Sequence, residues 1–251
     1  MSNFLLSIIL PVKNEENIIK ESIISFHNEI KETLNSENFE FIIILNGCTD
    51  KSEEIINPLK EKYKIKLIKL NKSNYGLSLR EGILNAKSDF VFILNADIKW
   101  DRKYFNWSWS NKSKYAIILG SKRADPTLNF QPIYRKLLSK GLNSILNILF
   151  DSVVMDTHGL KLVDLKKTIE IIKNSKMTRG QFDTEFTLKA LRGGLDIAEI
   201  PIVYQESRKP RNLMITKIFQ NIYDLFFLYR IMKKIKYSSN IRYRRFSRED
   251  L

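Results

Sequence analysis

The stretch LSIILPVKNEE, residues 6–16, joins a nearly continuous apolar run to a charged segment. Further runs rich in β-branched residues follow it: EFIIILN (40–46), KIKLIKL (64–70), DFVFILN (89–95) and YAIILG (115–120). Runs that are apolar along most of their length are typical of parallel strands covered on both faces of a sheet. Residues 64–70 alternate partly with lysine, which predicts a more exposed strand.

Helical patterns lie between these runs, over about residues 15–34, 51–63 and 76–87. The alternation of strands with helices predicts a doubly wound α/β sheet with right-handed connections. In sheets of this kind, ligands bind outside the carboxyl ends of the strands, where the strand order reverses. We therefore look for a site among the residues that follow the strands.

Polar side chains follow three of the predicted strands, in the segments PVKNEE (11–16), NGCTD (46–50) and NAD (95–97). Taken singly, each Asn or Asp is an ordinary turn or helix-cap residue. Because the three strand ends converge on one edge of the sheet, we favour a polar binding site there over three unrelated turns.

The composition excludes several classes of protein. Of the 251 residues, 43% are hydrophobic, which allows a sizeable core and excludes a mostly disordered chain. The single cysteine, Cys48, excludes an intrachain disulfide framework, argues with the two histidines against a Cys/His zinc site, and fits a reducing compartment. No apolar run reaches the roughly 18–20 residues of a membrane-spanning helix, and no secretory signal opens the sequence.

The net charge of +14 favours an anionic partner, whether a nucleotide, a phospholipid surface or a nucleic acid. A compositional bias toward lysine, isoleucine and asparagine would produce the same charge without a functional meaning. No nucleic-acid-binding motif accompanies the charge, so we expect no nucleic-acid partner.

The second half of the chain is less regular. We predict the following elements there: an amphipathic helix over 130–151, a polar turn at 156–159, helices near 164–174 and 182–192, a strand over 197–203, and a basic amphipathic helix over 213–235. A basic amphipathic helix can lie in a membrane interface. It can equally pack against the sheet or another subunit, and the sequence leaves both interpretations open.

The order of these segments resembles the family 2 glycosyltransferases with the GT-A fold, and it is most similar to their dolichol-phosphate mannosyltransferase-like branch. The resemblance runs from residue 7 to about residue 211. It is carried by PVKNE (11–15), NGCTD (46–50), NKSNYG (71–76), NAD (95–97), GSKR (120–123), DTHGLK (156–161), FDTE (182–185) and EIP (199–201). Each motif is weak alone, and their shared order and spacing carry the resemblance.

The resemblance implies an α/β, Rossmann-like GT-A fold with a mostly parallel sheet flanked by helices and a C-terminal amphipathic helical extension. It implies a glycosyltransferase domain over residues 1–211, divided into a nucleotide-sugar half (1–120) and an acceptor half (121–211). Residues 212–251 then form a basic amphipathic helix and tail.

The resemblance also implies roles for individual residues. It assigns the nucleotide to Pro11, Lys13, Glu15, Asn46, Asn95 and Ala96, and a divalent cation, Mg²⁺ or Mn²⁺, to Asp97 and Asn95. It assigns catalysis to Asp97, Asp183 and Glu185, and donor or acceptor phosphate to Arg123 and Arg208. The positive charge of Arg211 makes it a further phosphate candidate, with a solvated basic surface as the alternative. A guanidinium pairs bidentately with phosphate oxygens, which suits the three arginines to that role.

Three positions depart from the family pattern. Asn46 stands where the family has an acidic residue, Asn95 replaces the first Asp of the D-x-D motif, and Lys13 replaces an aromatic residue. The Asn95 side chain offers an oxygen to a cation but no negative charge, so we expect weaker metal binding than two carboxylates would give. An altered donor, a weak metal requirement and an inactive relative all fit these changes.

The acceptor decides whether a general base is needed. A polyprenyl phosphate is already anionic, whereas a sugar hydroxyl must lose a proton to a nearby carboxylate. Asp183 and Glu185 are two positions apart on a helix and point to different faces, so we expect one of them in the cleft and favour Asp183. The alternative is that both residues merely stabilise the start of that helix.

We therefore expect an inverting glycosyltransferase that moves a sugar from a UDP- or GDP-sugar to a lipid-linked polyprenyl phosphate. We expect it in the cytoplasm, peripheral at the inner face of the cell membrane. The alternatives are transfer to a saccharide hydroxyl in surface-polysaccharide synthesis, and a nucleotide-sugar-binding pseudoenzyme.

Overall fold

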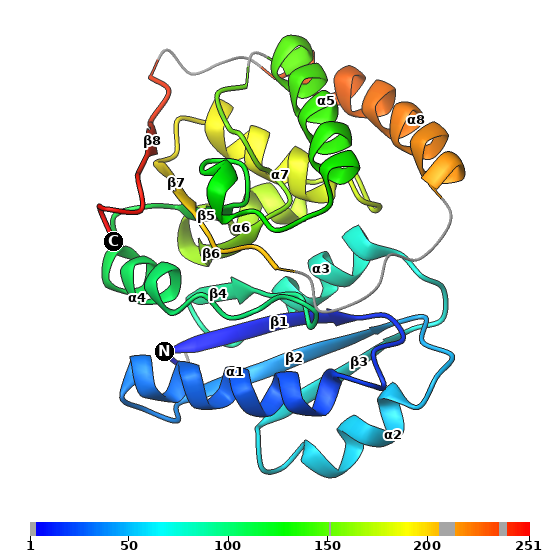
Figure 1. Ribbon diagram of the computed structural model, residues 1–251, viewed down its shortest axis with the longest axis vertical. Helices are drawn as coiled ribbons and strands as arrows, with labels where there is room; N and C mark the ends of the chain where they lie inside the picture. Colours follow the sequence, from blue (N-terminus) through cyan, green and yellow to red (C-terminus); the bar gives the residue numbers. More distant parts are fainter. Residues whose placement is uncertain (1–3, 151, 206–213, 236–239) are drawn as a thin grey trace.

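The computed structural model describes residues 4–150, 152–205, 214–235 and 240–251 (Figure 1). Its centre is an eight-stranded sheet in the order β3-β2-β1-β4-β6-β5-β7-β8. The strands are β1 (Leu6–Val12), β2 (Phe39–Asn46), β3 (Ile65–Leu70), β4 (Phe90–Ile93), β5 (Ile117–Ser121), β6 (Leu160–Asp164), β7 (Ile197–Pro201) and β8 (Tyr243–Arg245). The predicted α/β sheet is confirmed, and β3 is more exposed than β1 and β2, as its lysines indicated.

Parallel pairing joins β3, β2, β1 and β4, and the chain turns from one side of β1 to the other between β3 and β4. The carboxyl ends of β1 and β4 therefore flank the point where the strand order reverses, which is where such sheets bind ligands. Strand β6 then pairs antiparallel with both β4 and β5. The sequence predicts a turn followed by a helix in this region and does not predict β6. The strand has only five residues, and its mixture of polar and apolar side chains gives no clear strand pattern.

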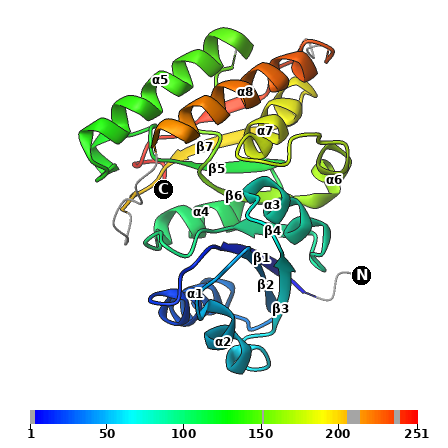
Figure 2. The ribbon, with the colours of Figure 1, turned by 90° about the vertical axis from the view of Figure 1, so that its right-hand side faces the viewer.

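Helices cover both faces of the sheet (Figure 2). They are α1 (Ile19–Leu34), α2 (Ser52–Ile56), α3 (Tyr75–Leu84), α4 (Arg102–Asn111), α5 (Ile133–Phe150), α6 (Leu165–Lys173), α7 (Phe182–Arg192) and α8 (Met214–Met232), with short 3₁₀ turns at Asn57–Leu59 and Pro126–Leu128. The core on one face takes its side chains from α1, α2 and α4. The core on the other face takes them from α3 and α5 to α8.

The amphipathic helices α5 and α8 pack on the sheet through one face each. Phe150 of α5 and Leu228 of α8 are fully buried in the second core. Their outer faces remain apolar, with Ile148 80% exposed and Phe226 62% exposed. In the described part of the chain, no helix combines the length and the apolar character needed to cross a membrane.

The C-terminal residues return to the sheet. Strand β8 pairs parallel with β7 at the edge of the sheet, although the sequence shows no strand pattern there. Phe246 packs against Trp107, with ring centroids 4.6 Å apart. The guanidinium of Arg248 forms a bidentate pair with the buried Asp101 carboxylate, at 2.7 and 2.9 Å. Residues 240–251 are thus fixed to the rest of the fold at several points.

Candidate functional site

Two strand-end loops are bound to each other by side-chain caps. Asn14, with a φ of +55°, donates from its side chain to Thr49 Oγ1 at 3.1 Å and accepts from the Thr49 amide at 2.8 Å. The Glu16 amide donates to an Asp50 carboxylate oxygen at 3.0 Å, and the Lys51 amide donates to Glu16 at 3.0 Å. The ends of β1 and β2 therefore form one rigid rim, as convergence of the strands predicted.

The predicted nucleotide residues of β1 lie on this rim. Pro11 belongs to the strand itself, and the Lys13 ammonium donates to the Gly47 carbonyl oxygen of the neighbouring loop. Glu15 is nearly buried, and its amide donates to Ser52 Oγ at 2.9 Å. Lys13 thus occupies the edge where the family pattern has an aromatic residue, and it binds backbone there.

Asn46 ends β2 and supports the start of α3. Its side-chain oxygen accepts from the Asn74 amide at 2.5 Å, and the Asn74 side chain in turn caps the helix by accepting from Leu77 at 3.2 Å. Asn46 is 5% exposed. The residue that replaces the family's acid therefore has a structural contact that links β2 to the first turn of α3.

The turn 95–97 follows β4 on the same rim. The Ala96 carbonyl oxygen accepts from Ser22 Oγ of α1 at 2.8 Å, which fixes the turn. Asp97 is 8% exposed. Among the described residues, no three His, Cys, Asp or Glu side chains gather to hold a metal ion by themselves. One carboxylate and one amide oxygen do fit a Mg²⁺ or Mn²⁺ ion that shares its remaining positions with water and substrate phosphate.

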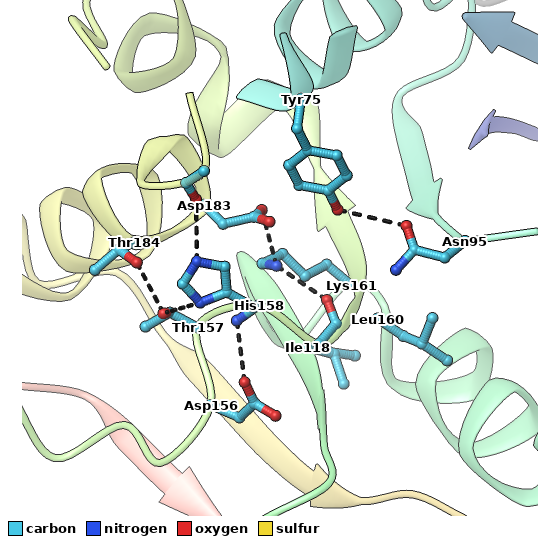
Figure 3. A network of polar contacts seen from close by, with 12 residues as sticks. Tyr75, Asn95, Ile118, Asp156, Thr157, His158, Leu160, Lys161, Asp183 and Thr184 are labelled. Atoms are coloured by element: carbon cyan, nitrogen blue, oxygen red, sulfur yellow. Dashed lines mark hydrogen bonds and ion pairs between the residues drawn. The ribbon is translucent and has the colours of Figure 1, made fainter. Parts of the chain in front are cut away.

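Tyr75, at the start of α3, lies between Asn95 and Asp183 (Figure 3). Its hydroxyl donates to the Asn95 side-chain oxygen at 3.4 Å. Burial, together with the charges of Asp183 and Asp97, holds the pKa of the Tyr75 phenol well above its usual value. Tyr75 therefore remains a hydrogen-bond donor, and the charges of Asp97 and Asp183 both act on its phenol.

Asp183, in the first turn of α7, forms a fully buried ion pair with Lys161 of β6 (Figure 3). The ammonium lies 2.9 Å from Asp183 Oδ1 and donates to the Gly159 carbonyl oxygen at 3.0 Å. Among the described residues neither oxygen of Asp183 has a well-directed hydrogen bond, so the contact is chiefly electrostatic. The carboxylate is held next to Tyr75 and is neutralised by a lysine.

Glu185 faces the other way. Its carboxylate accepts from the Lys176 amide at 2.8 Å and from the Met177 amide at 2.7 Å, and it pairs with Lys189 at 2.6 Å. The prediction that Asp183 and Glu185 point to different surroundings is confirmed. Glu185 stabilises the segment before α7, and Asp183 is the member of the pair that lies with the site residues.

His158 is neutral and fully hydrogen-bonded. Burial lowers the pKa of its imidazole against the opposing charges of Asp183 and Asp156. Its Nε2 lies 3.0 Å from the Gly180 carbonyl oxygen, which only accepts, so Nε2 carries the proton. Nδ1 then accepts from Thr157 Oγ1 at 3.1 Å. The structure gives His158 a positional role in the turn before β6.

Asp156 is the centre of a charged group beside the site. Burial alone would raise the pKa of its carboxyl, but the positive charges of Lys122 and Arg123 lower it below the usual value. Arg123 also donates to the Met155 carbonyl oxygen at 2.8 Å. The other predicted phosphate ligands, Arg208 and Arg211, lie outside the described residues.

Sequence reasoning missed two residues of this arrangement. Tyr75 lies inside the NKSNYG motif, and a tyrosine just before a helix is typical of an ordinary core residue. Lys161 lies in a mostly apolar segment, where a lysine side chain is expected to face solvent. The signal that could have revealed Lys161 was its position five residues after Asp156 in a motif already assigned to the site.

The chain is similar in sequence and in fold to known proteins. The family model described as glycosyl transferase family 2 matches residues 7–106. A dolichyl-phosphate beta-glucosyltransferase of Trichomonas vaginalis is 27% identical over 214 residues, covering 80% of this chain and 66% of that protein.

A second relative is the dolichyl N-acetyl-alpha-D-glucosaminyl phosphate 3-beta-D-2,3-diacetamido-2,3-dideoxy-beta-D-glucuronosyltransferase of Methanococcus voltae. It is 25% identical over 222 residues, covering 79% of this chain and 65% of that protein. This chain therefore spans just under two thirds of the length of either relative.

Solved structures share the fold. The glucosyl-3-phosphoglycerate synthase of Mycobacterium tuberculosis, crystallised with Mn²⁺, UDP-glucose and phosphoglyceric acid, matches with a TM-score of 0.64 at 15% identity, over 94% of this chain and 81% of that chain. S. aureus TarS 1–349 with UDP matches with a TM-score of 0.59 at 15% identity, over 91% of this chain and 65% of that one. The glycosyl transferase family 2 model thus matches residues 7–106 of this chain, and the solved structures show that the chain shares their fold.

Proposed function

We propose that this protein is an inverting glycosyltransferase that moves a sugar from a UDP- or GDP-sugar to a polyprenyl phosphate. The choice of acceptor rests on the contacts that the two acceptor-side carboxylates, Asp183 and Glu185, already make. Asp183 is neutralised by Lys161, and Glu185 is bound to backbone amides and to Lys189. Neither is placed to take a proton, which suits a phosphate acceptor that has none to lose. The dolichyl-phosphate beta-glucosyltransferase among the relatives supports the same choice.

The reaction is then a single displacement. An anionic oxygen of the acceptor phosphate forms a bond to the anomeric carbon, and the bond from that carbon to the donor diphosphate breaks. The electron pair of the broken bond leaves with the nucleoside diphosphate, and the anomeric configuration inverts. No proton transfer is needed, so the enzyme's main task is to orient the two phosphates and balance their charge.

The donor side of the site contains Pro11, Lys13, Glu15, Asn46, Asn95 and Ala96, which we assign to the nucleotide-sugar. Asp97 with Asn95 would hold a divalent cation, which supplies positive charge to the departing diphosphate. Arg123 lies on the acceptor side, beside Asp156, where a phosphate can be received. We assign Arg208 to the same task from its position in the resemblance, and Arg211 from its charge alone.

A nucleotide-sugar-binding pseudoenzyme is the second candidate, because Asn46 and Asn95 bring no charge and both already accept hydrogen bonds. Transfer to a saccharide hydroxyl needs a free carboxylate base, which neither Asp183 nor Glu185 supplies, although the name of the Methanococcus voltae relative describes transfer to position 3 of a lipid-linked sugar. A measurement of sugar transfer distinguishes the two candidates, because a pseudoenzyme would bind the nucleotide-sugar without transferring its sugar.

The outer faces of α5 and α8 support a peripheral position at the inner, cytoplasmic face of the cell membrane. Their exposed apolar residues form what we call the α5–α8 face: Ile133, Leu137, Ile145, Ile148, Leu149, Tyr223, Phe226, Phe227 and Tyr229. Exposed basic residues lie on the same helices or just after them: Lys140, Arg230, Lys233 and Lys234. An apolar face bordered by lysine and arginine suits an anionic lipid surface, where the lipid acceptor resides.

The donor and cation assignment predicts that one nucleotide, UDP or GDP, raises the melting temperature more with Mn²⁺ than without it. Asn95→Asp should tighten Mn²⁺ binding in the presence of that nucleotide by about tenfold, because it restores a second carboxylate. Asn28→Asp is the matched control, since it adds the same charge on an exposed face of α1. Equal stabilisation with and without Mn²⁺ would contradict the cation assignment.

The ion pair predicts opposite outcomes for single and double variants. Lys161→Met leaves the Asp183 charge unpaired and should lower the free energy of unfolding by about 3–5 kcal/mol, measured by urea denaturation. Lys161→Met combined with Asp183→Asn removes both charges and should recover most of that loss. In the double variant kcat should fall less than about tenfold, whereas loss of a general base costs about 10²–10⁴-fold. A loss in that larger range would indicate a hydroxyl acceptor.

The membrane assignment predicts co-sedimentation with vesicles that contain anionic lipid, and weak binding to neutral vesicles. Phe226→Glu and Ile148→Glu should each weaken the binding at least about tenfold, because each removes an inserted apolar side chain and adds a repelled charge. Leu5→Glu, at an exposed apolar residue outside the α5–α8 face, is the control. Binding that all three variants retain would refute a membrane role for this face.

A further inference from the structure

Glu199 of β7 is a fully buried carboxylate that holds a loop of the acceptor half. One of its oxygens accepts from the Met155 amide and the other from the Asp156 amide, each at 2.9 Å. Two backbone donors on two carboxylate oxygens define both the position and the orientation of that loop.

The loop held by Glu199 leads directly into the site. The Met155 carbonyl oxygen accepts from Arg123, and Asp156 accepts from the His158 amide at 3.1 Å. His158 in turn contacts the segment before α7 through Gly180. A displacement of Met155 and Asp156 would therefore move Arg123 and the groups around Asp183.

The C-terminal strand β8 reaches the same carboxylate. The Tyr243 hydroxyl donates to Glu199 Oε2, the oxygen that also accepts from Met155. Arg245 donates to Tyr243 Oη and to the Val153 carbonyl oxygen, each at 3.3 Å. Backbone pairing with β7 holds the strand in register. The Phe246 amide adds a hydrogen bond to the Glu199 backbone carbonyl oxygen at 3.0 Å.

We propose that Tyr243 is a positioning residue of the acceptor half, which acts through Glu199 to fix the Met155–His158 loop for sugar transfer. The kinetic part of this inference rests on the proposed function, and the structural part does not. The C-terminal residues 240–251 are then a working part of the site, although they lie at the far edge of the sheet (Figure 1).

Protonation of Glu199 gives this inference a pH dependence. Burial raises the pKa of the Glu199 carboxyl. Hydrogen bonds from the Met155 amide and from the Tyr243 and Ser121 hydroxyls lower this pKa, and the negative charge of Asp156 raises it further. The charged group nearest to it is Asp156, whose own charge is offset by Lys122 and Arg123. A further charge is that of Arg245, which donates to Tyr243 Oη. Removing the Tyr243 hydroxyl takes away a bond to the ionised form, so the pKa of Glu199 should rise further.

The test is Tyr243→Phe in the full-length protein. Hydrogen exchange of the Met155 and Asp156 amides should become about tenfold faster, because a bond to an ionised group is lost from their acceptor. The KM for polyprenyl phosphate should rise several-fold with little change in the donor KM, and the acid limb of kcat/KM should move to higher pH. Arg244→Gln, on the exposed side of the same strand, is the matched control and should change none of these quantities.

Glu199→Gln is the second variant, and it should reproduce the faster exchange while abolishing the shift of the acid limb. Combined with Tyr243→Phe it should add nothing further, since both changes act on one contact. Unchanged exchange at Met155 and Asp156 in Tyr243→Phe would overturn the inference, as would a kcat loss that is uniform with pH. If the wild-type protein transfers no sugar, the proposed function fails, and the exchange measurement still decides whether Tyr243 holds the loop.

Discussion

The buried ion pair between Lys161 and Asp183 is the constraint on which the site depends. Two charges removed from water are tolerated only when each neutralises the other, so β6 and the first turn of α7 must meet at a defined distance. That meeting point lies beside Tyr75, whose hydroxyl contacts Asn95 of the opposite half. The pair therefore does two things at once: it joins β6 to the start of α7, and it holds the Asp183 carboxylate near Tyr75 with a lysine as its partner.

Much of the parallel half of the fold could be predicted because its signals are local. The runs that became β1 and β2 are apolar throughout, and the polar residues after them converge because parallel strands end at one edge. Strands β6 and β8 could not be predicted, since each is short and owes its pairing to neighbours far away in sequence. The same holds for Lys161, because only the tertiary fold shows that Asp183 stands opposite it.

Two residues that depart from the family pattern make structural contacts that the sequence does not reveal. Asn46 and Asn95 read as losses of charge in the sequence, yet in the structure the first holds the start of α3 and the second receives the Tyr75 hydroxyl. The amphipathic helices show the complementary case, because one face of each packs on the sheet while the other remains apolar and exposed. Sequence periodicity identified the faces, and only the structure could say which face was covered.

The most direct measurement of the central claim is the product of the reaction. Purified protein would be incubated with UDP- and GDP-sugars, Mn²⁺ and a detergent-dispersed polyprenyl phosphate, and the lipid fraction analysed for bound sugar and its anomeric configuration. We predict a glycosyl phosphate lipid from one nucleotide-sugar, with the configuration inverted relative to the donor. Sugar found on a saccharide hydroxyl and never on the lipid phosphate would contradict the account, as would a bound nucleotide-sugar that yields no transfer at all.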